Sequence, residues 1–197
     1  HELLGTDLAT LHGCFAQLVF ALLVGLALFT SRWWQADTAP AREQDRPRLF
    51  RLALLLSVLI YVQIIFGAIV RHSYLRLAQR FHFLLAFAVV AVAVWLIRSA
   101  RDAASDRRLS VSANLLAVLL AIQIALGVES WLMRFGSGVL PELQRVTLAA
   151  GLVRTFHFVV GSLVFATSVV LTLLAARRPV GAVSYPTVRA PVLEGAA

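Results

Sequence analysis

The stretch that decides the fold is Leu52-Ala-Leu-Leu-Leu-Ser-Val-Leu-Ile-Tyr-Val-Gln-Ile-Ile-Phe-Gly-Ala-Ile-Val70, nineteen residues without a charged side chain. A helix needs about 20 apolar residues to cross the ~30 Å hydrocarbon core of a bilayer. Four further apolar segments occur, at residues 8–31, 81–97, 111–133 and 151–176. The sequence therefore predicts an all-α polytopic membrane protein with five transmembrane helices.

The overall composition agrees with this fold class. Of the 197 residues, 60% are hydrophobic and only 14% are charged, whereas a soluble domain of this length covers its surface with polar side chains. The net charge is +8, and all 18 basic residues are arginines that lie mainly in the links between apolar segments. This placement is typical of membrane topology rather than of a nucleic-acid surface, so we expect a lipid environment and no nucleic-acid partner.

The arginines also predict the orientation of the chain. Residues 32–51, residues 97–110 and the tail after residue 176 carry twelve arginines, and the opposite side, including the start of the fifth apolar segment, carries six. The positive-inside rule places the richer side in the cytoplasm, so we expect a bacterial inner-membrane protein with a cytoplasmic C-terminus. Residues 32–51 form a cytoplasmic linker in this interpretation, and residues 177–197 form a disordered tail. The first helix then starts outside, which calls for an odd number of helices, such as three, upstream.

A pattern recurs twice within residues 52–176. A helix that carries Gln-x-x-x-Gly is followed by a helix that opens on Phe-His-Phe. The two copies are Gln63 to Gly67 with Phe81-His82-Phe83, and Gln123 to Gly127 with Phe156-His157-Phe158. Both hairpins run out and then in, as parallel repeats do. We therefore expect these four helices to form a pseudo-twofold bundle whose facing side chains are available for a cofactor.

His82 and His157 are the main candidates for chemistry. A single histidine in an apolar helix is most simply a packing residue that bonds across a helix interface. Two histidines at equivalent positions of a repeat favour ligation instead, and neutral imidazole suits iron. No carboxylate or thiolate is repeated beside them, which argues against a zinc or two-metal centre. Two facing imidazoles suit the axial positions of a haem iron.

The residues around the histidines have two interpretations each. Gly67 and Gly127 either admit a porphyrin edge close to the backbone or let the helices pack closely. Gln63 and Gln123 either form interhelical hydrogen bonds or orient a ligand histidine. The flanking phenylalanines either contact a porphyrin or face lipid.

Three arginines lie near the outer ends of these helices. Haem propionates are anionic and need such partners, although the same side chains also serve as anchors at the membrane interface. Arg80 and Arg154 are the better candidates, because each is close in sequence to a histidine, and Arg71 is the third. His12 opens the first segment, and it is either an interface histidine or an iron ligand whose partner lies outside this chain.

These residues resemble the haem A synthase family, the membrane enzymes that make haem A from haem O. The resemblance covers residues 10–176. It is carried by Gly67-Ala-Ile-Val-Arg71-His72, by Phe81-His82, by the Gln-x-x-x-Gly of the fourth segment, by the histidine that opens the fifth, and by Leu11-His12 with the apolar run after it. The family's Glu-x-x-His-Arg stretch and its cysteine pairs in outer loops do not occur here.

The resemblance implies a fold of eight helices in two halves, each with a pair of histidines. Residues 1–31 would be the last helix of a truncated substrate half, and residues 52–176 the complete cofactor half. His82 and His157 would hold a b-type haem that relays electrons, and His12 would belong to the substrate site. There a methyl group of haem O is oxidised to the formyl group of haem A for cytochrome oxidase. Implied partners are haem O synthase, an electron donor and a second copy of the chain.

Two other functions fit the same residues. A bis-histidine b-type membrane cytochrome would transfer electrons without chemistry of its own. A membrane assembly protein would bind no haem at all, and its histidines would only pack.

Overall fold

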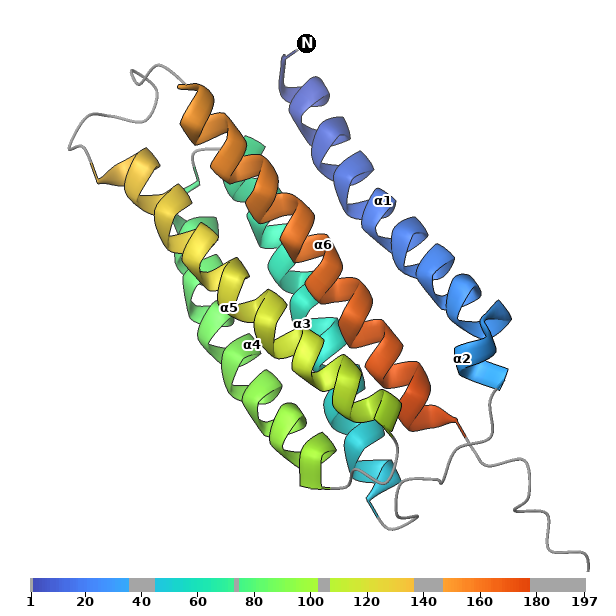
Figure 1. Ribbon diagram of the computed structural model, residues 1–197. Helices are drawn as coiled ribbons and strands as arrows, with labels where there is room; N and C mark the ends of the chain where they lie inside the picture. The colour runs from blue at the N-terminus through green and yellow to red at the C-terminus, as the bar shows by residue number, and fades with distance from the viewer. Residues whose placement is uncertain (1, 36–44, 73–74, 103–106, 137–146, 178–197) are drawn as a thin grey trace, which may run out of the picture.

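The structure is a computed structural model that describes residues 2–35, 45–72, 75–102, 107–136 and 147–177, with side chains described from residue 7 onward. The elements in these ranges are α1 (Glu2–Thr30), α2 (Arg32–Gln35), α3 (Arg46–His72), α4 (Arg76–Asp102), α5 (Arg107–Phe135) and α6 (Leu148–Ala176). Figure 1 shows the long helices lying side by side, with α1 at one edge. The all-α prediction is confirmed for the described residues.

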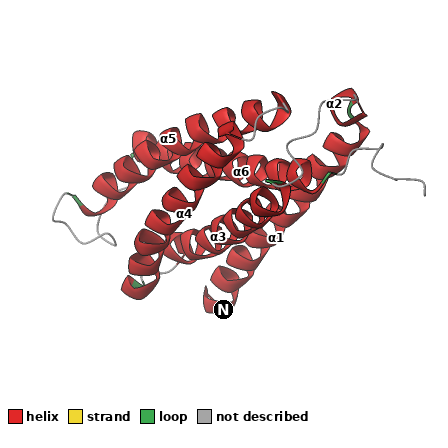
Figure 2. Cartoon of the chain, turned by 90° about the horizontal axis from the view of Figure 1, so that it is seen from below, coloured by secondary structure: helices red, strands yellow, loops and turns green. Residues whose placement is uncertain are grey.

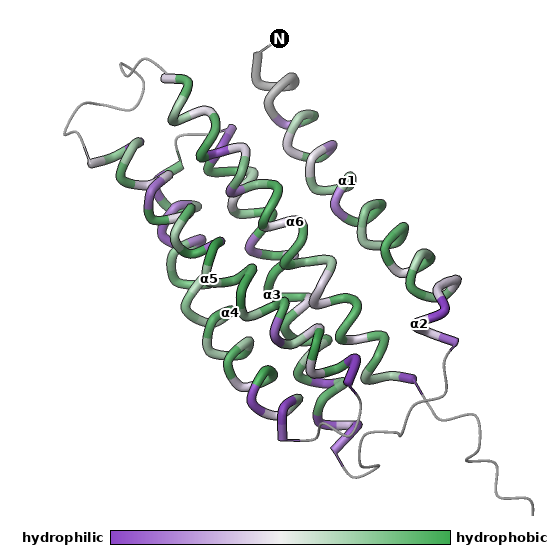
Figure 3. The backbone as a smooth tube through the Cα atoms, viewed as in Figure 1, coloured by the Kyte–Doolittle hydropathy of each residue, from purple (hydrophilic) through white to green (hydrophobic). Residues whose placement is uncertain are grey.

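Five of these helices are long and apolar enough to cross a membrane, as the sequence predicts. Figure 3 shows hydrophobic residues along their middles and hydrophilic residues gathered near their ends. The helices also extend beyond the apolar segments. For example, α3 begins at Arg46, within the predicted linker, and α2 lies there too. Pro47 is compatible with this early start because a first-turn residue needs no backbone donor. The predicted tail after Arg177 lies outside the described residues.

Four of the long helices pack in a ring. Helix α3 packs against α4 and α6, and α5 packs against the same two helices. As a result, α4 and α6 stand diagonally opposite, and side chains that they direct toward the axis of the ring face one another. Helix α1 packs outside the ring against α3 and α6. Figure 2 shows α1 beside α3, on the far side of the molecule from α5.

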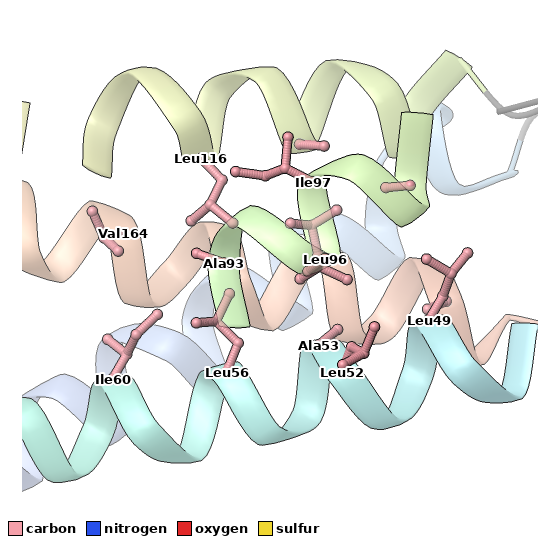
Figure 4. Packing of buried hydrophobic residues seen from close by; sticks show 14 of the residues in the cluster. Leu49, Leu52, Ala53, Leu56, Ile60, Ala93, Leu96, Ile97, Leu116 and Val164 are labelled. Carbon is pink, nitrogen blue, oxygen red and sulfur yellow. The ribbon is translucent and has the colours of Figure 1, made fainter. Parts of the chain in front are cut away.

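Buried apolar side chains fill only one half of this ring. The largest of them are Leu49, Leu56, Leu96, Leu116 and Leu171, which come from the beginnings of α3 and α5 and the ends of α4 and α6. Figure 4 shows these segments directing their side chains toward one another. We call this end the core half. Helices in lipid associate through van der Waals packing and hydrogen bonds rather than through removal of apolar surface from water. The core half, with its close side-chain contacts, therefore contributes most of the packing of the ring.

The other end, which we call the histidine half, comprises residues 61–72 of α3, 76–88 of α4, 121–135 of α5 and 148–163 of α6. Only two of its side chains are buried, Ala78 and Ala150. Every described side chain of α3 from Tyr61 to Val70 is partly accessible. The histidine half therefore does not close a core of its own with large side chains.

A cluster of hydroxyl groups ties α3 to α6 within the core half. The Ser57 hydroxyl donates to Ser168 Oγ at 3.0 Å and lies 3.1 Å from Thr172 Oγ1. Ser168 is fully buried and donates in turn to the Phe165 carbonyl at 2.7 Å. In an apolar setting, such bonds between small residues hold helices in register. They fix the position of α6 relative to α3 in the core half, next to the part of the ring that carries the histidines.

Candidate functional site

His82 and His157 each pack against a glycine of the preceding long helix. A Cβ placed on Gly67 would lie 3.2 Å from Cε1 of His82, and a Cβ on Gly127 would lie 3.1 Å from Cε1 of His157. These distances are shorter than an ordinary van der Waals contact. The space that a side chain would need at each glycine is therefore taken by an imidazole ring.

The glycine of the Gln-x-x-x-Gly motif also explains a hydrogen bond of His82. The Nδ1–H of His82 donates to the backbone carbonyl of Gln63 at 3.2 Å. Side chains in a helix lean toward its N-terminus, so a side chain at position 67 would cover the carbonyl four residues earlier. Glycine leaves that carbonyl open to the neighbouring helix.

This bond determines which nitrogen of His82 is free. A carbonyl oxygen can only accept, so the ring hydrogen sits on Nδ1, and Nε2 keeps its lone pair. A second bond joins the same two residues, because the side-chain Nε2 of Gln63 donates to the backbone carbonyl of His82 at 2.9 Å. His82 thus has the tautomer and the restrained orientation typical of a metal-ligating histidine.

His157 has the same tautomer but a different partner. The amide Nε2 of Gln123 donates to Nε2 of the ring at 3.3 Å, so the ring hydrogen is again on Nδ1. That Nδ1 is buried and has no hydrogen-bond partner among the described residues, and the same holds for Oε1 of Gln123. The lone pair of His157 is therefore already engaged, whereas that of His82 is not.

The two histidines come from the diagonal pair of helices. His82 lies in α4 and His157 in α6, and the imidazoles are near enough for a charge on one to act on the other. In the described ranges, no three His, Cys, Asp or Glu side chains gather into a group that would hold a bare metal ion. Two imidazoles brought from diagonal helices are a set that can bind a haem iron from both sides.

The flanking phenylalanines point outward. Phe81, Phe83, Phe156 and Phe158 are all exposed, with Phe81 stacked on Phe66 at 5.5 Å and Phe83 edge-on to Trp131 at 5.9 Å. Their exposure favours the lipid-facing interpretation. In each Phe-His-Phe motif the histidine is consequently more enclosed than its neighbours.

The arginines differ in how they approach the histidine half. Arg71 and Arg80 are exposed, and the Arg71 guanidinium lies 5.9 Å from the Phe158 ring centre, on α6. Arg154 is half-buried, and its Nε is buried without a hydrogen-bond partner in the described part of the chain. Of the three predicted arginines, Arg154 therefore has the most evident need for an anionic partner.

Arg134 is a residue whose role the sequence did not reveal. Its Nη1 donates to the carbonyl of Val70 at 3.0 Å, which joins α5 to α3 across the second diagonal of the ring. Val70 is in the last turn of α3, where carbonyl groups lack helical partners. Arg134 thus spans the open end of the histidine half. Only its position directly after the apolar segment at residues 111–133 could have suggested this.

His12 lies apart from the histidine pair. Helix α1 buries one face, formed by Cys14, Gln17, Ala21, Gly25 and Leu28. His12 is exposed and precedes Cys14 by two residues, which places it on the opposite face of the helix. The described residues do not bring His12 together with His82 and His157.

Comparison with known proteins gives no match to a family model, to a curated protein or to a solved structure. The two histidines, the glycines against which they pack and the glutamines that contact them are therefore the features from which a function can be proposed.

Proposed function

We propose that this chain is a membrane haem protein of the haem A synthase type, in which His82 and His157 hold a b-type haem that relays electrons. One observation carries the proposal: both histidines sit against glycines on diagonal helices with the ring hydrogen on Nδ1. That tautomer leaves Nε2 of His82 free as a donor, and it frees Nε2 of His157 as a donor once the bond from Gln123 is released.

The surroundings fit a flat, largely apolar group with an anionic edge. The histidine half has only two buried alanines of its own, so a ligand there would complete the packing that the side chains leave unfinished. The buried Nε of Arg154 and the exposed guanidinium groups of Arg71 and Arg80 would pair with propionate groups. A haem bound in this way supplies reversible one-electron chemistry.

We also propose that the five long helices cross the bacterial inner membrane, with the C-terminus in the cytoplasm and with α3–α4 and α5–α6 related by a pseudo-twofold axis along the membrane normal. The arginine distribution supports the orientation. The matching contacts of His82 with Gly67 and of His157 with Gly127 support the axis. In such an arrangement the two histidines lie at the same depth.

In this proposal His12 would belong to a second site that holds haem O, and the haem held by His82 and His157 would supply one-electron transfer to that site. The second candidate function is a b-type cytochrome that only transfers electrons. His12 is exposed and lies away from His82 and His157. The described residues therefore offer ligands for one haem, which is all that an electron carrier needs and one fewer than a synthase needs.

Absorption spectra of the chain purified after expression with ample haem test the haem assignment. We expect a low-spin bis-histidine spectrum that is lost in His82→Ala and in His157→Ala and kept in the control His72→Ala. A colourless wild-type protein, or unchanged spectra in both histidine variants, would contradict the assignment. Extraction of pigments from cells that make haem O separates the two functions, since only a synthase yields haem A.

A further inference from the structure

The two glutamines of the repeat make different contacts, although they occupy equivalent positions. The amide of Gln63 donates to the backbone carbonyl of His82, whereas the amide of Gln123 donates to the ring nitrogen of His157. No hydrogen bond reaches Nε2 of His82 from the described residues. Nε2 of His82 is consequently available to bind a metal, whereas Nε2 of His157 already accepts a hydrogen bond from Gln123.

The two hairpins differ by a single methyl group at the position four residues after the histidine. Gly161 lies four residues after His157, and a Cβ there would be 3.0 Å from Nε2 of Gln123. At the equivalent place four residues after His82, α4 has Ala86. A methyl group at position 161 would crowd Nε2 of Gln123, and the first hairpin carries such a methyl group at Ala86.

We propose that the two axial positions of the site are unequal: His82 is a fixed ligand, and His157 is a displaceable one held back by Gln123. This inference rests on the proposed haem function and deepens it. To bind iron, His157 must give up the Gln123 bond. The amide would then be left with neither nitrogen nor oxygen paired, since Oε1 already has no partner among the described residues. Leaving buried polar groups unpaired is costly.

It follows that the His157 side is the face at which a small neutral ligand, such as carbon monoxide, replaces the protein donor. The freed imidazole would return to its hydrogen bond with Gln123, which favours the exchange. His82 gains nothing comparable by leaving the iron.

Carbon monoxide titration of the reduced, haem-loaded protein tests this inequality. Gln123→Leu removes the amide, and Gly161→Ala displaces it while leaving the glutamine in place. Each variant is expected to raise the carbon monoxide concentration at half-saturation about fivefold, which corresponds to one net hydrogen bond. The matched comparator Gln63→Leu is expected not to raise it. The reciprocal variant Ala86→Gly gives Gln63 access to His82 and is expected to lower it.

The outcomes separate this inference from the haem assignment. A wild-type protein that takes up no haem contradicts both. Haem uptake with equal half-saturation in wild type, Gln123→Leu and Gly161→Ala overturns only the inequality of the two ligands, as does an equal rise in Gln63→Leu. Loss of haem uptake in both Gln123→Leu and Gly161→Ala would also overturn the inequality. That result would show that Gln123 helps His157 to bind iron rather than competing with the iron.

Discussion

The imidazole of His82 occupies the space in which a side chain at position 67 would lie, with Cε1 only 3.2 Å from where the Cβ would be. Gly127 stands in the same relation to His157. Substitution at either glycine should therefore act on the histidine rather than on the helix. Alanine is the better helix former by about 1 kcal/mol, so the backbone itself does not resist the change.

We expect Gly67→Ala and Gly127→Ala to reduce haem affinity about tenfold, because each displaces an imidazole and, at position 67, covers the Gln63 carbonyl. The thermal stability of the haem-free protein should be unchanged or raised. Haem titration together with thermal unfolding measures both effects. Gly13→Ala is the matched control, since a Cβ there meets nothing within 4 Å. Equal haem affinity in all three variants would refute the role given to the glycines.

Arg154→Gln should speed the loss of haem several-fold. The Nε of Arg154 is buried and unpaired among the described residues, and a propionate would satisfy it with a charge-assisted bond. Transfer of haem to haem-free myoglobin gives the rate. Arg98→Gln, at an exposed position on the core half of α4, serves as the control. If the two substitutions gave the same rate as wild type, Arg154 would have no part in holding the cofactor.

Ser168→Leu should destabilise the protein by about 1–3 kcal/mol, because a larger side chain overpacks a tight helix contact. Ser168 is fully buried between α6 and α3, and its hydroxyl accepts from Ser57 at 3.0 Å. Denaturation in a mild detergent measures the change. Ser162→Leu, on the same helix, makes the same substitution where the hydroxyl bonds only to its own helix at the Phe158 carbonyl. A comparable loss in both variants would mean that Ser168 has no special place in the contact.

A reporter joined after residue 177 should be active on the cytoplasmic side. Twelve arginines lie in the links and tail on the proposed cytoplasmic side, against six on the other side, and such a bias sets the orientation of membrane proteins. A phosphatase, active only outside, and a fluorescent protein, active only inside, give opposite readings at this position. A reporter in the 73–74 link should give the reverse pattern. Phosphatase activity after residue 177 would mean that the chain crosses the membrane in the opposite orientation to the one proposed.

The sequence predicted the helices and the histidine pair because both depend on side-chain type. Apolar runs specify the spans, and a repeated Phe-His-Phe motif marks His82 and His157 as equivalent. The helix ends were less predictable. Helix α3 starts at Arg46 because polar residues extend a helix as readily as apolar ones do once it has formed.

The detailed contacts of the site could not be predicted in the same way. The partner of His82 Nδ1 is the backbone carbonyl of Gln63, which every residue possesses, so the side chain gives no sign of it. The contrast between Gly161 and Ala86 has meaning only when the neighbouring helix is in place. Arg134 reaches Val70 across a diagonal, and no local spacing encodes that distance.

The confinement of large buried apolar side chains to the core half gives the molecule two regions of different local stability. Backbone amides near Leu56 and Leu116 are surrounded by packed side chains and should exchange with solvent far more slowly than those near the histidines, where few contacts must break for a local opening. The helices can thus separate around His82 and His157 while the opposite end remains folded. In the proposed haem protein, the chain can therefore fold at the core half first and receive the haem afterwards, as the last step of its maturation.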